Sequence, residues 1–181
     1  MLQPVDIAVA AIAAYRRHQN GAWAPKGVRE DLNLPWSSLH LCLSRLQRAN
    51  IIRNGRVNRV ALAALLPILQ YLIPVVPERS RQVRGIPTGA SAPIFAGQIV
   101  ASESFVWEFE SGDEMGYAIA PLHPLIPKAV MHHPELHGVM ACLDAARMGK
   151  ARELAVAFEC LQYLIGFPSP EASPSIARHN N

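Results

Sequence analysis

Apolar residues recur at helical spacing through the first fifty positions of the chain, which predicts three helices. The first helix is predicted over residues 5–18 and the second over residues 26–33. The third begins at Ser37 or Ser38, because a serine oxygen there can accept from the free amides of the first turn. It extends to Ala49, so the order is that of a helix-turn-helix.

The third predicted helix has two chemically different faces. Its apolar face carries Leu39, Cys42, Leu43, Leu46 and Ala49. The opposite face is small, polar or basic and carries Ser37, His40, Leu41, Ser44 and Arg48, with Arg45 at its margin. Short hydroxyl side chains let a helix lie close to base edges, and Arg can bridge to guanine or to phosphate. The outer face therefore has the composition of a helix that reads a DNA groove.

A short basic hairpin is predicted directly after this helix. Residues 51–59 place two β-branched arms around Asn54-Gly55, the pair best suited to the positive φ angles of a type I′ turn. The arms and their flank carry Arg53, Arg56 and Arg59. An isolated Asn-Gly turn is a common surface feature, but a basic hairpin after a helix-turn-helix is the arrangement of a wing. Its two-residue turn limits its reach, which favours phosphate contact over minor-groove insertion.

The middle of the chain is predicted to be a helix followed by a linker. Asn58 caps a fourth helix that runs to about Ile73, with a bend at Pro67. This helix has too many apolar residues for one narrow stripe, so it is expected to have two partners. Residues 75–98 are rich in proline and arginine and show neither a helical nor an alternating period, which predicts a linker.

The remaining residues predict a small α+β region. Residues 105–109 alternate as in a strand, and residues 117–120 are its expected hairpin partner. Two helices follow, over residues 134–148 and 150–164, as a hairpin for dimerisation or for a protein partner. The final residues 167–181 repeat Ser and Pro without a hydrophobic period, which predicts a disordered tail.

The predicted fold is mainly α with short β elements. It comprises a winged helix-turn-helix domain over residues 1–74, the linker over 75–98, and a smaller α+β region over 99–166 that ends in a helical hairpin. Composition agrees with a globular chain, since 50% of the 181 residues are hydrophobic and 17% are charged. Charge is divided: residues 1–85 carry a net +8 and residues 86–181 a net −5. The basic part is expected to attract a polyanion.

The segment from Ser37 to Arg53, S-S-L-H-L-C-L-S-R-L-Q-R-A-N-I-I-R, resembles the recognition helix and wing entry of MarR-like winged helix-turn-helix regulators. The resemblance implies a homodimer that binds double-stranded DNA sequence-selectively. Residues expected to touch DNA are Lys26, Ser37, Ser38, His40, Leu41, Ser44, Arg45, Arg48, Arg53, Asn54, Arg56 and Arg59. The pentad R-G-I-P-T and the run R-M-G-K-A-R-E-L-A are also similar to winged-helix proteins encoded beside nucleotidyltransferase-type toxins, which implies an antitoxin-like alternative.

A metal-dependent enzyme is the third alternative, because His132, His133 and His137 lie near Cys142. His133 precedes Pro134, however, which biases it toward a helix cap rather than a helix face. No phosphate-binding loop or nucleophile motif accompanies these residues, so the chain is expected not to be an enzyme and to need no cofactor.

Cellular location is predicted from the cysteines and the hydropathy. The three cysteines are scattered, which argues against a disulfide scaffold and favours a reducing, cytoplasmic compartment. The longest apolar stretch, residues 60–76, is interrupted by Pro67 and Pro74 and is too short to span a bilayer. A membrane is therefore not among the expected partners.

Overall fold

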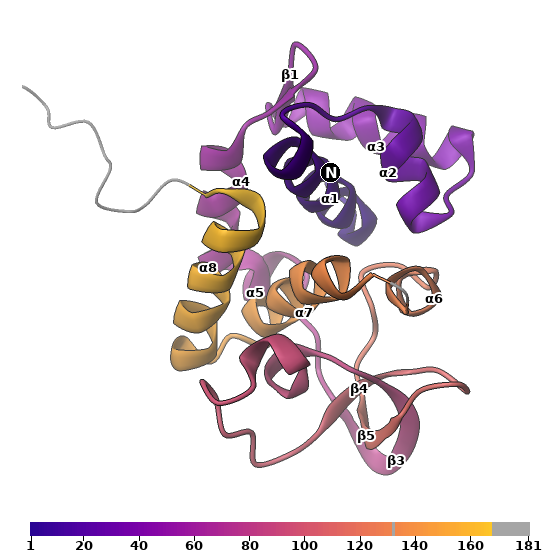
Figure 1. Cartoon of the computed structure of the whole chain (residues 1–181), viewed down its shortest axis with the longest axis vertical. Coiled ribbons are helices and arrows are strands. Elements are labelled where there is room, and N and C mark those ends of the chain that lie inside the picture. Colours follow the sequence, from indigo (N-terminus) through magenta and orange to yellow (C-terminus); the bar gives the residue numbers. More distant parts are fainter. Residues whose placement is uncertain (132, 168–181) are drawn as a thin grey trace, which may run out of the picture.

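The fold is mainly α with short β elements, as predicted. The computed structural model describes residues 1–131 and 133–167. Helices α1–α3 and the β1–β2 hairpin, within residues 4–57, form one end of the molecule, and strands β3–β5, within residues 78–118, lie at the opposite end (Figure 1). Helix α7 (Pro134–Met148) crosses the middle, and helix α8 (Ala151–Ile165) lies along one side. Within the described ranges, no helix is long and apolar enough to cross a membrane.

The predicted amino-terminal elements are confirmed. They are α1 (Pro4–Asn20), α2 (Pro25–Leu32), α3 (Trp36–Arg48), β1 (Ile52–Arg53), β2 (Arg56–Val57) and α4 (Arg59–Leu65). The predicted cap of α3 is wrong, because α3 begins at Trp36 after Pro35 and places Ser37 and Ser38 inside its first turn. Pro35 occupies the N-cap position with a φ of −61°, and its ring has no oxygen that could accept from the first-turn amides, so α3 has no side-chain cap.

Helix α1 is buried on every side. All residues from Asp6 to Ala14 are buried, although the apolar period predicts only one buried face. The helix packs against α2, α3 and α4 and also against α7 and α8. Alanine is small enough to let helices approach α1 closely from several directions, and five of these nine buried residues are alanine.

The predicted fourth helix is interrupted where its proline lies. Asn58 caps α4 as expected, because its Oδ1 accepts from the Ala61 amide at 3.1 Å. The chain then tightens into the 3₁₀ turn η1 (Leu66–Ile68) around Pro67 and continues as α5 (Leu69–Leu72). The buried residues of this segment are Leu62, Ala63, Leu66 and Leu69.

The linker prediction for residues 75–98 is wrong, because strand β3 (Glu78–Pro87) occupies much of it. β3 pairs antiparallel with β4 (Phe105–Glu108) and with β5 (Glu114–Ala118). Exposed and buried residues do not alternate along β3, because residues 78–82 are all exposed and the buried residues lie near its other end. Two 3₁₀ turns, η2 (Gly89–Ser91) and η3 (Pro93–Phe95), follow it.

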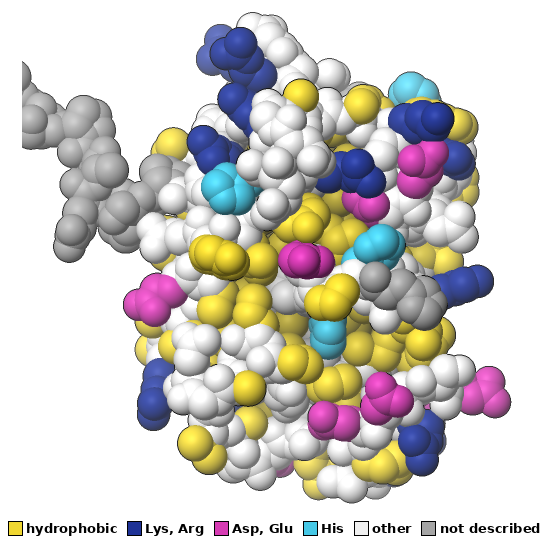
Figure 2. Space-filling view, in the orientation of Figure 1, with side chains coloured by type: hydrophobic (Ala, Val, Ile, Leu, Met, Phe, Trp, Pro, Cys, Tyr) yellow, Lys and Arg dark blue, Asp and Glu magenta, His cyan; other side chains and the backbone are white. Residues whose placement is uncertain are grey.

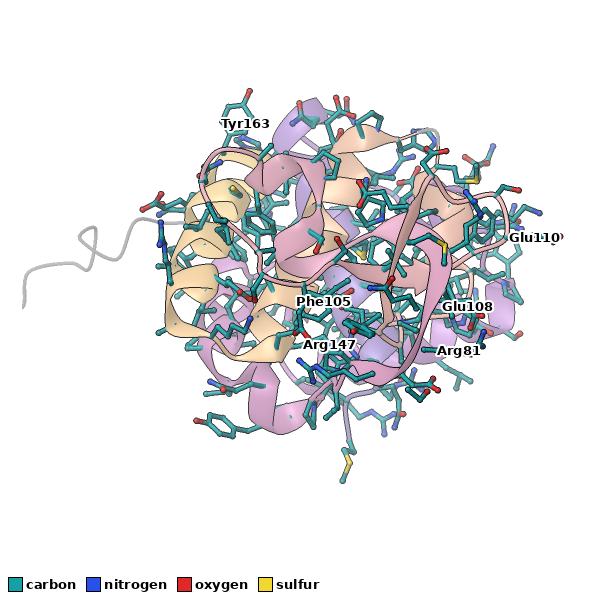
Figure 3. All side chains as sticks on the ribbon, turned by 90° about the horizontal axis from the view of Figure 1, so that it is seen from below. Arg81, Phe105, Glu108, Glu110, Arg147 and Tyr163 are labelled. Atoms are coloured by element: carbon teal, nitrogen blue, oxygen red, sulfur yellow. The ribbon has the colours of Figure 1, made fainter. Side chains whose placement is uncertain are left out.

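The hairpin predicted between residues 105–109 and 117–120 is also wrong. β4 and β5 run parallel, with Phe105 opposite Tyr117, and the three strands close on each other as a very small barrel. The barrel is so narrow that Gly112 lies directly against the backbone of Gly85, where a Cβ atom would have no room. Arg81 and Glu108 form an ion pair at its outer edge (Figure 3).

A buried polar network joins the barrel to the helical body. Asp144 on α7 accepts hydrogen bonds from Thr88 Oγ1 at 2.9 Å and from Trp107 Nε1 at 2.6 Å, and it forms an ion pair with Arg147. Arg147 also donates to the carbonyl oxygens of Ile73 and Ala120, at 3.0 and 3.1 Å. Burial raises the pKa of Asp144, whereas Arg147 and the two hydrogen-bond donors oppose that rise.

The predicted carboxy-terminal helices are confirmed as α7 (Pro134–Met148) and α8 (Ala151–Ile165), joined at Gly149 with a φ of +77°. A short helix, α6 (Ile126–Val130), precedes them and was not predicted. The apolar faces of α7 and α8 pack on each other and on α1, and the role of this hairpin in dimerisation or in binding a protein partner stays a prediction. The tail predicted over residues 167–181 lies outside the described residues, apart from the buried Phe167.

Candidate nucleic-acid interface

The predicted outer face of α3 is exposed. Ser37, His40, Leu41, Ser44 and Arg48 are exposed, whereas Ser38 is half-buried. Leu39, Cys42 and Leu46 on the opposite face are buried, and Leu43 is half-buried. Ala49, predicted to be in the core, is exposed just beyond the end of the helix. The two-faced pattern of the sequence therefore matches the burial of the helix.

Arg45 does not belong to the exposed face, which corrects its place among the predicted DNA contacts. Its Nε and an NH2 nitrogen donate to the two carboxylate oxygens of Asp6, at 2.7 and 2.8 Å. Asp6 is fully buried and also accepts from the Gln3 amide at 2.7 Å. A planar fork that is already bound to a buried carboxylate has a structural role, namely to fasten α3 to α1.

Aromatic contacts position the beginning of α3. The Trp36 ring stacks on His40 with centroids 5.8 Å apart, and the Arg29 guanidinium lies 5.1 Å from the same Trp36 ring. Arg16 on α1 binds Asp31 on α2 through two hydrogen bonds, which fixes the helix before the turn. Sequence reasoning missed Trp36, although an aromatic residue four positions before His40 on a helix is a usable signal.

The hairpin has the predicted turn. Asn54 and Gly55 have φ angles of +50° and +70°, and Arg53 lies opposite Arg56 in the β1–β2 register. Both arginines are exposed. Trp23, in the segment between α1 and α2, donates from Nε1 to the Gly55 carbonyl at 3.1 Å and ties the hairpin tip to the body. This contact joins residues far apart in sequence, so no local pattern predicts it.

The remaining predicted contacts differ in their surroundings. Lys26 is exposed on α2 and lies 3.9 Å from Glu30, a distance at which an exposed ion pair contributes little. Arg59 is half-buried, and its guanidinium lies against Gly166 at the end of α8 and near His18. Arg59 is therefore turned toward the helical body, and its role as a phosphate anchor stays a prediction.

The charges at this end of the molecule favour an anion. Arg48, Arg53, Arg56 and Lys26 are exposed there, and exposed positive charges on one face attract a polyanion. In the space-filling view, Lys and Arg side chains gather at the upper end, whereas most Asp and Glu side chains lie lower (Figure 2). The basic and acidic residues, which are separated along the sequence, are thus also separated on this face of the molecule.

Of the residues predicted as a possible metal site, His133, His137 and Cys142 are described, and they are not brought together as a metal site. His133 caps α7 and is exposed, and Nε2 of His137 lies 2.6 Å from the Pro87 carbonyl oxygen. Burial lowers the pKa of His137. His132 lies outside the described residues. Among residues 1–131 and 133–167, no three His, Cys, Asp or Glu side chains are placed to hold a metal ion.

Cys142 and Cys160 face each other across α7 and α8. Cys142 is buried, and burial raises the pKa of its thiol. A hydrogen bond from Cys142 lowers the pKa of Cys160 to about 7. Cys160 is half-buried and lines a shallow groove with Ile94 and Tyr163.

Comparisons of the chain with protein-family models, characterised proteins and solved structures give no match. The geometry of α3 and the β1–β2 hairpin is therefore the basis for a functional proposal.

Proposed function

We propose that this protein is a transcriptional regulator that binds double-stranded DNA sequence-selectively as a homodimer. The supporting observation is the exposed polar face of α3 beside a hairpin that exposes Arg53 and Arg56. A helix of this kind fits the major groove, and a basic hairpin beside it reaches the flanking phosphates. The resemblance to MarR-like regulators supports the same function.

Each side chain in the interface has a separate role in this proposal. Arg48 offers two parallel N–H groups to a guanine, and the hydroxyl groups of Ser37 and Ser44 are short enough to reach base edges. Leu41, which is 60% exposed, contacts a thymine methyl. Arg53 and Arg56 bind phosphates, and each neutralised phosphate contributes about −0.9 to the slope of log K against log salt concentration.

The test begins with selection of bound duplexes from a random pool. A two-fold sequence motif is the expected result, because a homodimer binds two half-sites related by symmetry. Recovery of no preferred duplex, together with a partner protein that stays bound at high salt, would favour the antitoxin-like alternative instead.

Substitutions then separate the roles. Arg56→Ala should weaken binding to all duplexes similarly and reduce the salt slope by about one, whereas Arg48→Ala should also relax sequence preference. Arg81→Ala is the matched control, because Arg81 is an exposed arginine on β3 that pairs with Glu108. Equal effects of all three substitutions on affinity and on salt slope would contradict the proposal.

A further inference from the structure

The segment from α4 to α5 has a second apolar face that no described residue covers. Leu62, Leu66 and Leu69 point into the core. The opposite face runs along the helix at intervals of three or four residues, and the exposed Val76 follows in the segment after α5. Its members, here called the α4–α5 stripe, are Val60, Ala64, Pro67, Ile68, Tyr71, Leu72 and Val76, all exposed.

The stripe is large and uncharged. Tyr71 exposes 76% of its surface and Val76 exposes 80%. No Asp, Glu, Lys or Arg occurs between Arg59 and Glu78. Helices that bind a bilayer surface carry Lys and Arg beside their apolar face, and the other side of this segment is core instead. These features favour a protein partner over a membrane.

The area of the stripe decides what kind of contact it can make. Its larger side chains together expose about 500 Å² of apolar surface. A two-fold contact that covered both stripes completely would bury about 1,000 Å² in total, which is at the lower limit of specific interfaces. A different partner would need its own matching patch, whereas a second copy supplies an identical one by symmetry.

We propose that a second copy of this chain covers the α4–α5 stripe, so that the two stripes pack on each other about a two-fold axis. The inference rests on the proposed function, because a dimer places two recognition helices on the two half-sites of an operator. Without a charge in the stripe, two basic copies meet there with no like-charge repulsion between facing side chains. A contact of this area lies at the low end of specific interfaces, where weak and transient complexes are found.

The test is sedimentation of the full chain across a concentration series up to about 100 µM, so that a weak dimer is also detected. Wild type is expected to reach twice the mass of the chain. Tyr71→Glu and Val76→Glu should each raise the dissociation constant by about tenfold or more, because they place a charge in an apolar contact. Val100→Glu is the matched control, since Val100 is 97% exposed outside the stripe and the same charge is added.

Binding to DNA distinguishes this inference from the proposed function. On a half-site duplex, Val76→Glu should bind like Val100→Glu, whereas on the two-fold operator it should bind about tenfold more weakly. A wild-type chain that stays monomeric at every concentration, or stripe variants that dimerise like wild type, would overturn the inference even if the half-site is bound. Dimerisation through the stripe without binding to any duplex would leave the inference standing and refute the proposed function.

Discussion

Arg45 and Arg48 lie three residues apart on α3, and their substitution should affect different properties: stability for Arg45 and DNA binding for Arg48. Arg45 binds the buried carboxylate of Asp6 through two hydrogen bonds, whereas Arg48 is exposed and donates one long hydrogen bond, at 3.4 Å, to the Ser44 carbonyl. Arg45→Ala should therefore destabilise the fold. Arg48→Ala should leave the fold intact and weaken only the binding of DNA.

The expected magnitude follows from the surroundings of Asp6. Removing one partner of a buried ion pair costs about 3–5 kcal/mol, because the other charge stays buried without compensation. Asp6 keeps the hydrogen bond from the Gln3 amide, and the Arg45 side chain is 22% exposed, so the lower end applies. A loss of about 3 kcal/mol corresponds to a fall in Tm of about 6–12 °C for a chain of this length.

Urea unfolding followed by far-UV circular dichroism measures both substitutions in one assay. Arg48→Ala, as an exposed substitution, should change the free energy of unfolding by less than about 0.5 kcal/mol. Arg45→Lys should fall between wild type and Arg45→Ala, because it keeps the charge but loses the two-pronged geometry. Equal unfolding free energies for Arg45→Ala and Arg48→Ala would refute the assignment of Arg45 to the core.

Three further outcomes test other parts of the structure. Gly55→Ala should cost about 1 kcal/mol of stability or DNA affinity, because its φ of +70° disfavours a side chain; unchanged unfolding and binding would count against a rigid wing turn. Asp144→Ala should lower the free energy of unfolding by about 3–5 kcal/mol in urea, since Arg147 loses its buried counter-charge. Alkylation of Cys160 should rise with pH around a midpoint of about 7, and Cys142→Ala should move that midpoint toward 9.0; a midpoint that stays in place would exclude Cys142 as the cause.

Local patterns predicted the elements whose stability is mostly local. The helices over residues 4–20 and 134–148 follow from their apolar periods, and the hairpin follows from Asn54-Gly55. The exposed face of α3 also follows from the sequence, because its polar and apolar residues separate cleanly on a helix.

Long-range contacts account for the features that sequence reasoning missed. β3 has one exposed end and one buried end, so its apolar and polar residues do not alternate, and its partners lie nineteen or more residues away. Arginine is a residue type that often contacts DNA, which is why Arg45 was predicted to do so. Its actual partner, Asp6, lies 39 residues earlier, within an apolar run. Trp23 donates a hydrogen bond to the Gly55 carbonyl of the hairpin, and no spacing of residues along the sequence predicts this contact.

The burial of α1 on every side has a consequence for any attempt to divide the protein. A fragment that stops at residue 74 would leave the alanines that pack on α7 and α8 facing water, and α3 would then be fastened to an unsupported helix. Grafting the first 74 residues onto an unrelated carrier would fail for the same reason, since α3, the β1–β2 hairpin and the helices beneath them form a single folding unit built on one shared helix.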